Sequence, residues 1–331
     1  MPIQLGLASS HAPSLFYHTY EGWEKTYQRM KVGHPQPHET EAIETQEEIE
    51  RRVPRIKQNF AALKEQLTAY NPDTLIVVMG DQREWFDASN IPNIAIYVGD
   101  DIWGVHNTGA ADEDPPANPN EDHERFRLEV TTDKELSSHL LNGLVAKGFD
   151  VAIMNKMNPQ SNPKRGVPHG LMNPMPHILP RPNLPVVLVW VNVDDGPPAI
   201  LDGQRTLELG RAIAELCEQS DKRIAIYGSG GMSHNPGGPR AGWVDEPLDN
   251  WFLDQLTNGT MDNLKAMFSF RSENMVGGTG ELHCWIAVAG AIDYIKPGHK
   301  AVKVDYLPAR KVTTGCGWAY WPPVEAPVAV G

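Results

Sequence analysis

The sequence predicts a single α/β domain in which helices flank a mainly parallel central sheet. Residues 75–79 form an uninterrupted apolar run, typical of a strand buried on both faces, and residues 186–193 form the most apolar strand of the chain. Segments with helical periodicity alternate with such runs, which favours parallel strands joined by helices. The 331 residues can bury a large core without disulfide support, so we treat residues 1–331 as one domain.

The first part of the chain predicts strands at 2–8, 75–79 and 93–98 and a long charged helical segment. That segment covers residues 39–70 and repeats apolar side chains every three or four positions, as one face of a helix requires. Pro54 lies inside it and lacks a backbone N–H, so we expect it to divide the segment into two helices.

Residues 100–130 are polar and rich in proline and aspartate, which predicts a long surface loop. Within it, we interpret the acidic segment 112–124 as a solvated loop. A helix capped by Thr132 should follow, because leucines recur after it at helical spacing. Residues 151–154 then predict another strand.

The second half of the chain continues the alternation of strands and helices after a proline-rich segment, 158–185, that we expect to be irregular. From there we expect, in order, a strand at 186–193, a helix at about 204–218, a strand at 224–227, helices at about 248–256 and 280–294, and a strand at 301–306. We interpret the proline-rich tail, 318–330, as a segment suited to lie on a neighbouring subunit.

Composition and charge exclude several classes of partner. The chain has 29 Lys and Arg against 42 Asp and Glu, a formal net charge of −13, so nucleic acid and anionic membrane surfaces would be repelled. No apolar stretch is long enough to span a membrane. Cys217, Cys284 and Cys316 are too scattered for a disulfide framework, which suits a reducing compartment. We therefore expect a cytoplasmic protein with a small-molecule substrate.

Polar side chains follow several of the predicted strands. His11, Gln82, Asn192 and His234 each lie at or shortly after a strand end, and His169 lies in the proline-rich loop that follows the strand at 151–154. In open α/β sheets, ligands bind where the carboxyl ends of the strands meet the connecting loops. Any one of these residues alone is best interpreted as an ordinary loop residue, but their coincidence at several strand ends favours a shared site.

The turn at 228–234 combines glycines with a histidine. It lacks the spacing of a phosphate-binding loop and no lysine follows it, so nucleotide binding is disfavoured. We expect its glycines to allow close approach of the backbone to a ligand.

Residues 228–234, together with 238–242 and 249–254, resemble the signature block of the class III extradiol ring-cleavage dioxygenases. The resemblance is to the type of the catalytic subunit of protocatechuate 4,5-dioxygenase and of the gallate and 3-O-methylgallate dioxygenases. Further matches occur in order along the chain, at 9–13, at 155–157 leading to His169-Gly170, and at Glu281-Leu282 with Trp285. The resemblance covers nearly the whole chain.

This resemblance implies a non-heme Fe(II) centre held by two histidines and one glutamate, with open positions for a catecholate and dioxygen. His11 matches the first histidine ligand and Glu281 matches the carboxylate. His234 matches the acid/base histidine, and His169 matches a histidine that hydrogen-bonds the substrate. The family motif has Asp before that histidine, where this chain has Pro168.

The second histidine ligand is replaced, because the chain has Gln82 where the family commonly has histidine. Gln82 could ligate through its amide oxygen or orient a metal-bound water, and a neutral amide is a weaker ligand for Fe(II) than imidazole. Alternatively, His106 or His283 fills the vacancy, although residues two apart on a helix, as His283 and Glu281 would be, do not face the same way. The last alternative is a cavity without metal, which we rank below a site with Fe(II) or another divalent metal.

Arg240 and Asn192 are candidate substrate-binding residues. Arg240 could pair with a substrate carboxylate in fork geometry, or pair within the chain with Asp245 or Glu246. We expect a dioxygenase-like enzyme that acts on a catecholic or methoxylated aromatic acid with dioxygen. The alternatives are a non-oxidative lyase, hydrolase or decarboxylase in the same cleft, and a metal-free binding protein. Relatives often assemble, so we expect a homo-oligomer, with a small partner subunit as a further option.

Overall fold

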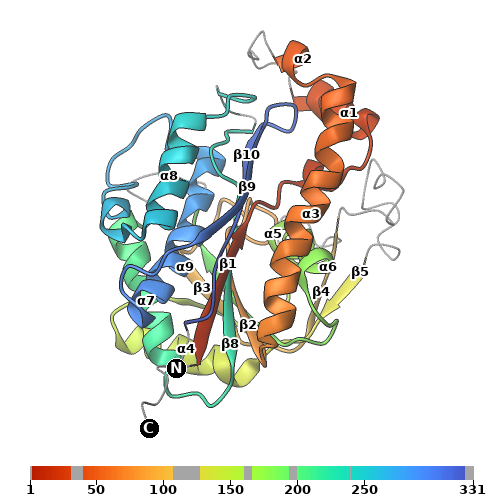
Figure 1. Cartoon of the computed structure of the whole chain (residues 1–331). Helices are drawn as coiled ribbons and strands as arrows, with labels where there is room; N and C mark the ends of the chain where they lie inside the picture. The colour runs from red at the N-terminus through yellow and green to blue at the C-terminus, as the bar shows by residue number, and fades with distance from the viewer. Residues whose placement is uncertain are drawn as a thin grey trace.

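The architecture was determined as a computed structural model, which describes residues 2–30, 40–106, 127–159, 166–193, 200–236, 238 and 240–324. Within these residues, eight strands form one sheet in the order β6-β3-β7-β2-β8-β1-β10-β9 (Figure 1). The strands are β1 (Ile3–Ser9), β2 (Thr74–Met79), β3 (Ile94–Tyr97), β6 (Ala152–Met154), β7 (Val186–Val191), β8 (Ile224–Ser229), β9 (Val302–Ala309) and β10 (Thr314–Trp321).

The centre of the sheet is parallel. β7, β2, β8 and β1 pair in parallel, so their carboxyl ends meet at one edge. β3 runs antiparallel to β7, and β10 runs antiparallel to both β1 and β9. The predicted fold class, an α/β domain with a mainly parallel sheet, is confirmed.

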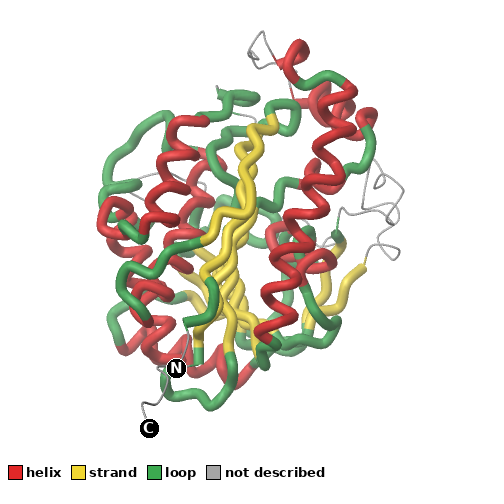
Figure 2. Tube along the Cα trace, in the orientation of Figure 1, coloured by secondary structure: helices red, strands yellow, loops and turns green. Residues whose placement is uncertain are grey.

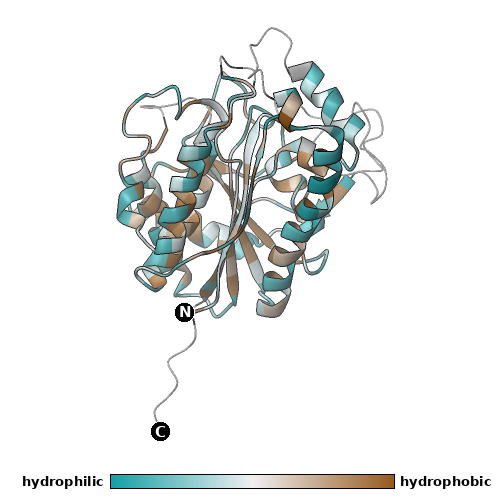
Figure 3. Ribbon diagram, turned by 45° about the horizontal axis from the view of Figure 1, so that its top comes forward, coloured by the Kyte–Doolittle hydropathy of each residue, from teal (hydrophilic) through white to brown (hydrophobic). Residues whose placement is uncertain are grey.

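Helices cover both faces of the sheet (Figures 1 and 2). Side chains alternate along β2, so Leu75, Val77 and Met79 pack with one cluster and Ile76 and Val78 with the other. One face is covered by α4 (Lys134–Ala146), α7 (Gly203–Cys217), α8 (Glu246–Asn258) and α9 (Leu282–Ile295). The other is covered by α1 (Tyr20–Met30), α3 (Gln46–Tyr70), α5 (His169–Met172) and α6 (Met175–Ile178). The outer faces of these helices are more hydrophilic than the strands between them (Figure 3).

The expected break at Pro54 is wrong, because α3 continues through it. Pro54 lies on the exposed side of α3, where water can satisfy the carbonyl that loses its partner, while the opposite side is buried. The division falls earlier, between α2 (Thr40–Ile43) and the N-cap of α3 at Thr45.

The ends of segment 100–130 are not loop but a small antiparallel sheet, formed by β4 (Ile102–Val105) and β5 (Arg127–Val130). The Arg127 guanidinium lies 4.3 Å from the ring centre of Trp103 across this pair. The acidic segment 112–124 lies outside the described residues. The next helix, α4, is capped by Asp133 rather than Thr132, since the Asp133 carboxylate accepts from the Leu136 N–H.

The proline-rich segment 158–185 is less irregular than predicted, since it contains the short helices α5 and α6. Further along, short 3₁₀ turns occur at η1 (Pro13–Phe16), η2 (Met261–Leu264) and η3 (Gly277–Glu281). α9 begins at Leu282, so Glu281 belongs to η3 and not to the apolar helix itself.

The interpretation of 318–330 as an intersubunit tail is wrong for its first residues. Trp318 and Trp321 are buried in β10, which lies between β1 and β9 in the sheet. The prolines that predict a tail follow this apolar, aromatic strand and do not extend into it. In the part of the chain that the structure describes, no helix has the length and apolar character needed to cross a membrane.

Candidate active site

Four side chains from distant parts of the chain converge beyond the carboxyl ends of the parallel strands. His11 follows β1, Gln82 follows β2, His234 follows β8, and Glu281 ends η3. His11 Nε2 and His234 Nε2 each lie 3.6 Å from the same oxygen, Glu281 Oε1. The predicted approach of His11 and Glu281, 270 positions apart in the sequence, is therefore found in the structure.

The tautomer of His11 follows from its partners. The Ser229 hydroxyl donates to the Gly170 carbonyl at 2.5 Å, so its oxygen must accept from His11 Nδ1, 2.9 Å away. In the neutral ring, His11 Nε2 then carries a lone pair directed toward Glu281 and Gln82. This is the state that metal ligation requires of an imidazole.

Glu281 is a buried anion, 1% exposed. Burial alone would raise the pKa of its carboxyl, but the positive charge of the His11 and His234 imidazoles, when they are protonated, holds that pKa well below the ordinary value. Its Oε2 accepts from the Gly231 N–H. Gly230 allows this approach, because a Cβ there would lie 2.5 Å from the Glu281 carbonyl oxygen.

Hydrogen bonds to both the backbone and the ring of His234 fix its position. Its N–H donates to Thr279 Oγ1 at 3.1 Å, and Thr279 N–H donates to the His234 carbonyl at 3.0 Å. The ring Nδ1–H donates to the Met232 carbonyl at 2.8 Å, which leaves Nε2 facing Glu281. Burial lowers the pKa of His234, but the Glu281 carboxylate outweighs it and the net shift is upward.

Gln82 lies on a tight turn organised by Asp81. The Asp81 carboxylate accepts from the backbone N–H groups of Glu84, Trp85 and Phe86. The Gln82 amide nitrogen donates to Glu281 Oε1 and lies 3.4 Å from His11 Nε2. Gln82 Oε1 is buried and has no hydrogen-bond partner among the described residues.

The donor atoms of this cluster determine whether it can hold a metal ion. No three His, Cys, Asp or Glu side chains in the described ranges are grouped so that they could hold one. A mixed set can fit, because the lone pairs of neutral His11 and of Glu281 converge, and rotation of the Gln82 amide, whose nitrogen faces them here, would present its unpartnered oxygen instead. Imidazole, carboxylate and amide are ligand types that first-row divalent metals accept. The replacement of the second ligand histidine by Gln82 therefore still leaves an oxygen atom that could donate a lone pair to a metal.

His169 is the first residue of α5 and lies beside this cluster. Its ring centre is 5.0 Å from that of His11, at an interplanar angle of 80°. Its Nδ1 and its backbone N–H both contact the Glu84 carboxylate, at 2.9 and 2.7 Å.

The other predicted residues fall outside this cluster of contacts. Arg240 donates to Asn274 Oδ1, while Glu246 pairs with Arg310 at 2.7 Å. Asn192 lies at the end of β7 and its amide donates to Asn93 Oδ1 at 3.4 Å. Both substrate-binding assignments stay predictions.

The two alternative histidines do not fill the vacancy in this structure. His283 is buried with both ring nitrogens on backbone carbonyls, those of Gly280 and Leu201. His106 lies near a different histidine, His177. Burial lowers the pKa of His177 to about 4, and the charge of the His106 imidazole contributes to this lowering.

Ser229 and Glu84 were missed by the sequence analysis. Like the other candidates, both lie at or after the carboxyl end of a strand, since Ser229 ends β8 and Glu84 lies five residues after β2. Their partners are distant in sequence, so no local spacing revealed them.

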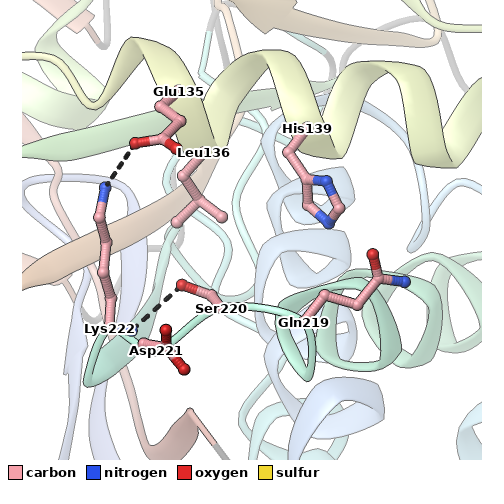
Figure 4. A pocket seen from close by; sticks show the side chains of 7 residues that line it. All are labelled: Glu135, Leu136, His139, Gln219, Ser220, Asp221 and Lys222. Atoms are coloured by element: carbon pink, nitrogen blue, oxygen red, sulfur yellow. Dashed lines mark hydrogen bonds and ion pairs between the residues drawn. The ribbon is translucent and has the colours of Figure 1, made fainter.

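A separate pocket of about 330 Å³ lies at the opposite edge of the sheet, before β8 (Figure 4). Lys222 at its rim pairs with Asp133 at 2.7 Å and with Glu135 at 3.9 Å. These ion pairs join the start of α4 to the start of β8, so we interpret its charged groups as structural.

The fold and the buried cluster define an α/β enzyme whose polar site lies at the carboxyl edge of its parallel strands. A family model described as "Catalytic LigB subunit of aromatic ring-opening dioxygenase" matches residues 8–315, and the chain belongs to this family. The resemblance carried by residues 228–254 is confirmed.

Curated relatives are similar over part of their length. A "2,3-dihydroxyphenylpropionate/2,3-dihydroxicinnamic acid 1,2-dioxygenase" of Photorhabdus laumondii is 27% identical over 201 residues, 60% of this chain and 54% of that protein. A protein of the same name from Mycobacterium sp. is 28% identical over 181 residues, 54% of this chain and 48% of that protein. The chain thus spans about half the length of these relatives. A solved structure of an uncharacterized Escherichia coli K12 protein aligns over 96% of this chain and 99% of its own, with 11% identity and a TM-score of 0.46.

Proposed function

We propose that the protein cleaves the ring of a catecholic or methoxylated aromatic acid with dioxygen, using non-heme Fe(II) bound by His11, Glu281 and Gln82. The observation that carries this proposal is the convergence of His11 Nε2 and Glu281 Oε1, 3.6 Å apart, beside the half-buried Gln82 amide. Family membership supports the reaction class. The names of the relatives favour a catechol with a short carboxylate side chain as substrate.

When bound, Fe(II) would lower the pKa of the substrate hydroxyls and bring substrate and dioxygen together. The chain's own residues handle the protons. His234 Nε2 would accept a hydroxyl proton, since its Nδ1–H is committed to the Met232 carbonyl. His169 would hydrogen-bond the substrate from α5, and Arg240 and Asn192 would contact its carboxylate or ring substituents.

The test measures oxygen uptake and ring-opened product with protein reconstituted with Fe(II) without air. The substrates are 2,3-dihydroxyphenylpropionate, protocatechuate, gallate and 3-O-methylgallate. We expect uptake of oxygen with at least one of them. Substrate loss without oxygen uptake would instead identify a lyase, hydrolase or decarboxylase. The remaining outcome is that the protein, purified without chelator, contains no stoichiometric metal and turns over none of these four substrates. That outcome would favour a binding protein.

We further propose that the protein works in the cytoplasm as a homo-oligomer, with or without a small partner subunit. The description of the matching family as a catalytic subunit supports an assembly, and the three scattered cysteines suit a reducing compartment. Light scattering of the purified chain, alone and with cell extract, measures the assembly.

A further inference from the structure

Glu84 holds His169 at two points. Glu84 Oε1 lies 2.9 Å from His169 Nδ1, and Glu84 Oε2 accepts from the His169 backbone N–H at 2.7 Å. The side chains of both residues are largely buried, at 16% and 11% exposed. An ionised carboxylate can only accept hydrogen bonds, so the proton in the first contact must belong to His169 Nδ1.

No residue adjacent to His169 supplies this contact. The preceding residue, Pro168, has no N–H and makes no side-chain cap for α5. The cap of α5 is instead the Glu84 carboxylate, which belongs to the turn after β2 and accepts from the His169 backbone N–H.

That turn is held in one conformation. Asp81 Oδ1 accepts from the N–H groups of Glu84 and Trp85, at 3.2 and 2.8 Å. Arg83 adopts a left-handed backbone, with φ of 57°, between Gln82 and Glu84. One short turn thus directs Gln82 toward Glu281 and Glu84 toward His169, so the two side chains are placed together.

We propose that Glu84 is a positioning residue that holds neutral His169 as the Nδ1–H tautomer, so that its Nε2 accepts a hydrogen bond from a substrate hydroxyl. This rests on the proposed function, since it assigns the donor to a phenolic hydroxyl of the bound aromatic ring. The ring of His169 stands edge-on to that of His11, which brings it next to the atoms that would hold that hydroxyl.

Glu84→Gln provides the sharpest test, because an amide has one accepting oxygen and one donating nitrogen. It cannot accept from both His169 Nδ1 and the His169 backbone N–H. We expect part of the His169 population to change to the Nε2–H tautomer. Long-range ¹H–¹⁵N spectra of ¹⁵N-histidine-labelled full chain, without added iron and at about pH 8.5, report the tautomer. The His169 signal is assigned by its loss in His169→Gln.

The kinetic arm uses the Fe(II)-reconstituted enzyme. We expect Glu84→Gln to lower kcat/KM by about 10- to 100-fold, as loss of a partner behind an active-site histidine typically does. Glu84→Asp keeps the charge but is one methylene shorter, so we expect it to retain the Nδ1–H tautomer and to recover part of kcat/KM. Glu135→Gln, an exposed carboxylate at the opposite edge of the sheet, is the matched control and should change neither readout.

Two results would overturn the proposal. One is a wild-type His169 that is not a neutral Nδ1–H ring, or that keeps this tautomer in Glu84→Gln. The other is a changed tautomer with unchanged kcat/KM. If the wild type oxidises no catechol, the proposed function fails separately, and the spectra still decide whether Glu84 sets the tautomer.

Discussion

The side-chain amide of Gln82 donates a hydrogen bond to the Glu281 carboxylate, although 199 positions separate them in the sequence. The same nitrogen lies 3.4 Å from His11 Nε2. Residue 82 therefore contacts both of the side chains best suited to bind a metal. Its chemistry should set how tightly this site binds one.

Gln82→His should strengthen metal binding. Imidazole is a better ligand for first-row divalent metals than a neutral amide oxygen. We expect the affinity for Co²⁺ or Fe²⁺ to rise about tenfold or more, equivalent to about 1.4 kcal/mol. Isothermal titration without air measures it. Gln58→His, on the exposed side of α3, is the control for added histidine, and equal affinities in the two variants would contradict a ligand role for Gln82.

His234→Gln should depress turnover far more than substrate binding. The amide can hydrogen-bond but cannot carry a proton between reacting groups, so we expect kcat to fall by about 10²- to 10⁴-fold with a small change in KM. Steady-state oxygen uptake measures both constants. His139→Gln changes a histidine in the remote pocket of Figure 4 and should behave as the wild type. A normal kcat in His234→Gln would exclude the acid/base role.

Gly278→Ala tests the placement of the same imidazole without removing it. A Cβ at Gly278 would lie 2.0 Å from His234 Nε2, so the ring must move. We expect kcat to fall toward the value of His234→Gln. Gly143→Ala is equally crowded, since its Cβ would lie 2.3 Å from Leu216 Cδ2, but it is remote from the site and should retain kcat. Equal kcat values for the two alanine variants would show that His234 tolerates displacement.

Arg52→Met should destabilise the fold strongly. Glu44 is fully buried, and its carboxylate accepts from Arg52 at 2.6 Å and from the backbone N–H groups of Arg310 and Lys311. Removing the guanidinium leaves a buried carboxylate without its cation, which costs about 3–5 kcal/mol. Urea unfolding at neutral pH measures the loss.

Arg51→Met is the matched control for this change. The Arg51 side chain is 76% exposed, and within the described ranges its ion pair is with Glu48 one turn away, so its removal should cost less than about 1 kcal/mol. If Arg52→Met and Arg51→Met lowered the free energy of unfolding by similar amounts, the buried Arg52–Glu44 pair would not be the source of the stability.

The central strands were predictable because a strand that is buried on both faces has a continuous run of apolar residues in the sequence. Residues 75–79 and 186–191 are apolar throughout, and the structure makes them β2 and β7. Pro54 misled because the effect of a proline depends on which side of the helix it faces, and that side is set by tertiary packing. β10 was missed because its prolines follow the strand rather than interrupt it.

The site was predictable where a residue follows a strand end or belongs to a recognisable motif. His11 was found in both ways and Glu281 through the family resemblance, and their contact then follows from the topology, since β1 lies beside β8 and η3 packs on the Gly230 turn. The roles of Ser229 and Glu84 depend on which imidazole faces them. That information exists only in three dimensions.

Stability should fall as pH rises through the titration of Asp249. Burial raises the pKa of this carboxyl to about 6, although hydrogen bonds from Tyr306 and Ser233 partly oppose the shift. Between about pH 4 and 6 the unfolded chain releases this proton while the folded chain retains it, so unfolding becomes more favourable as pH increases. The difference between this pKa and that of the same carboxyl in the unfolded chain corresponds to roughly 3 kcal/mol. Above pH 6 the contribution is constant.

Asp249→Asn removes this titration and keeps the shape. Its amide oxygen can accept from the Ser233 N–H, and its nitrogen can donate to the Ser233 or Tyr306 hydroxyl. We expect its free energy of unfolding, relative to the wild type, to increase by up to about 3 kcal/mol from pH 4 to pH 7. Urea unfolding across this range measures the difference. Asp254→Asn, exposed on the same helix, should follow the wild-type profile, and a pH-independent difference for Asp249→Asn would show that Asp249 is ionised throughout.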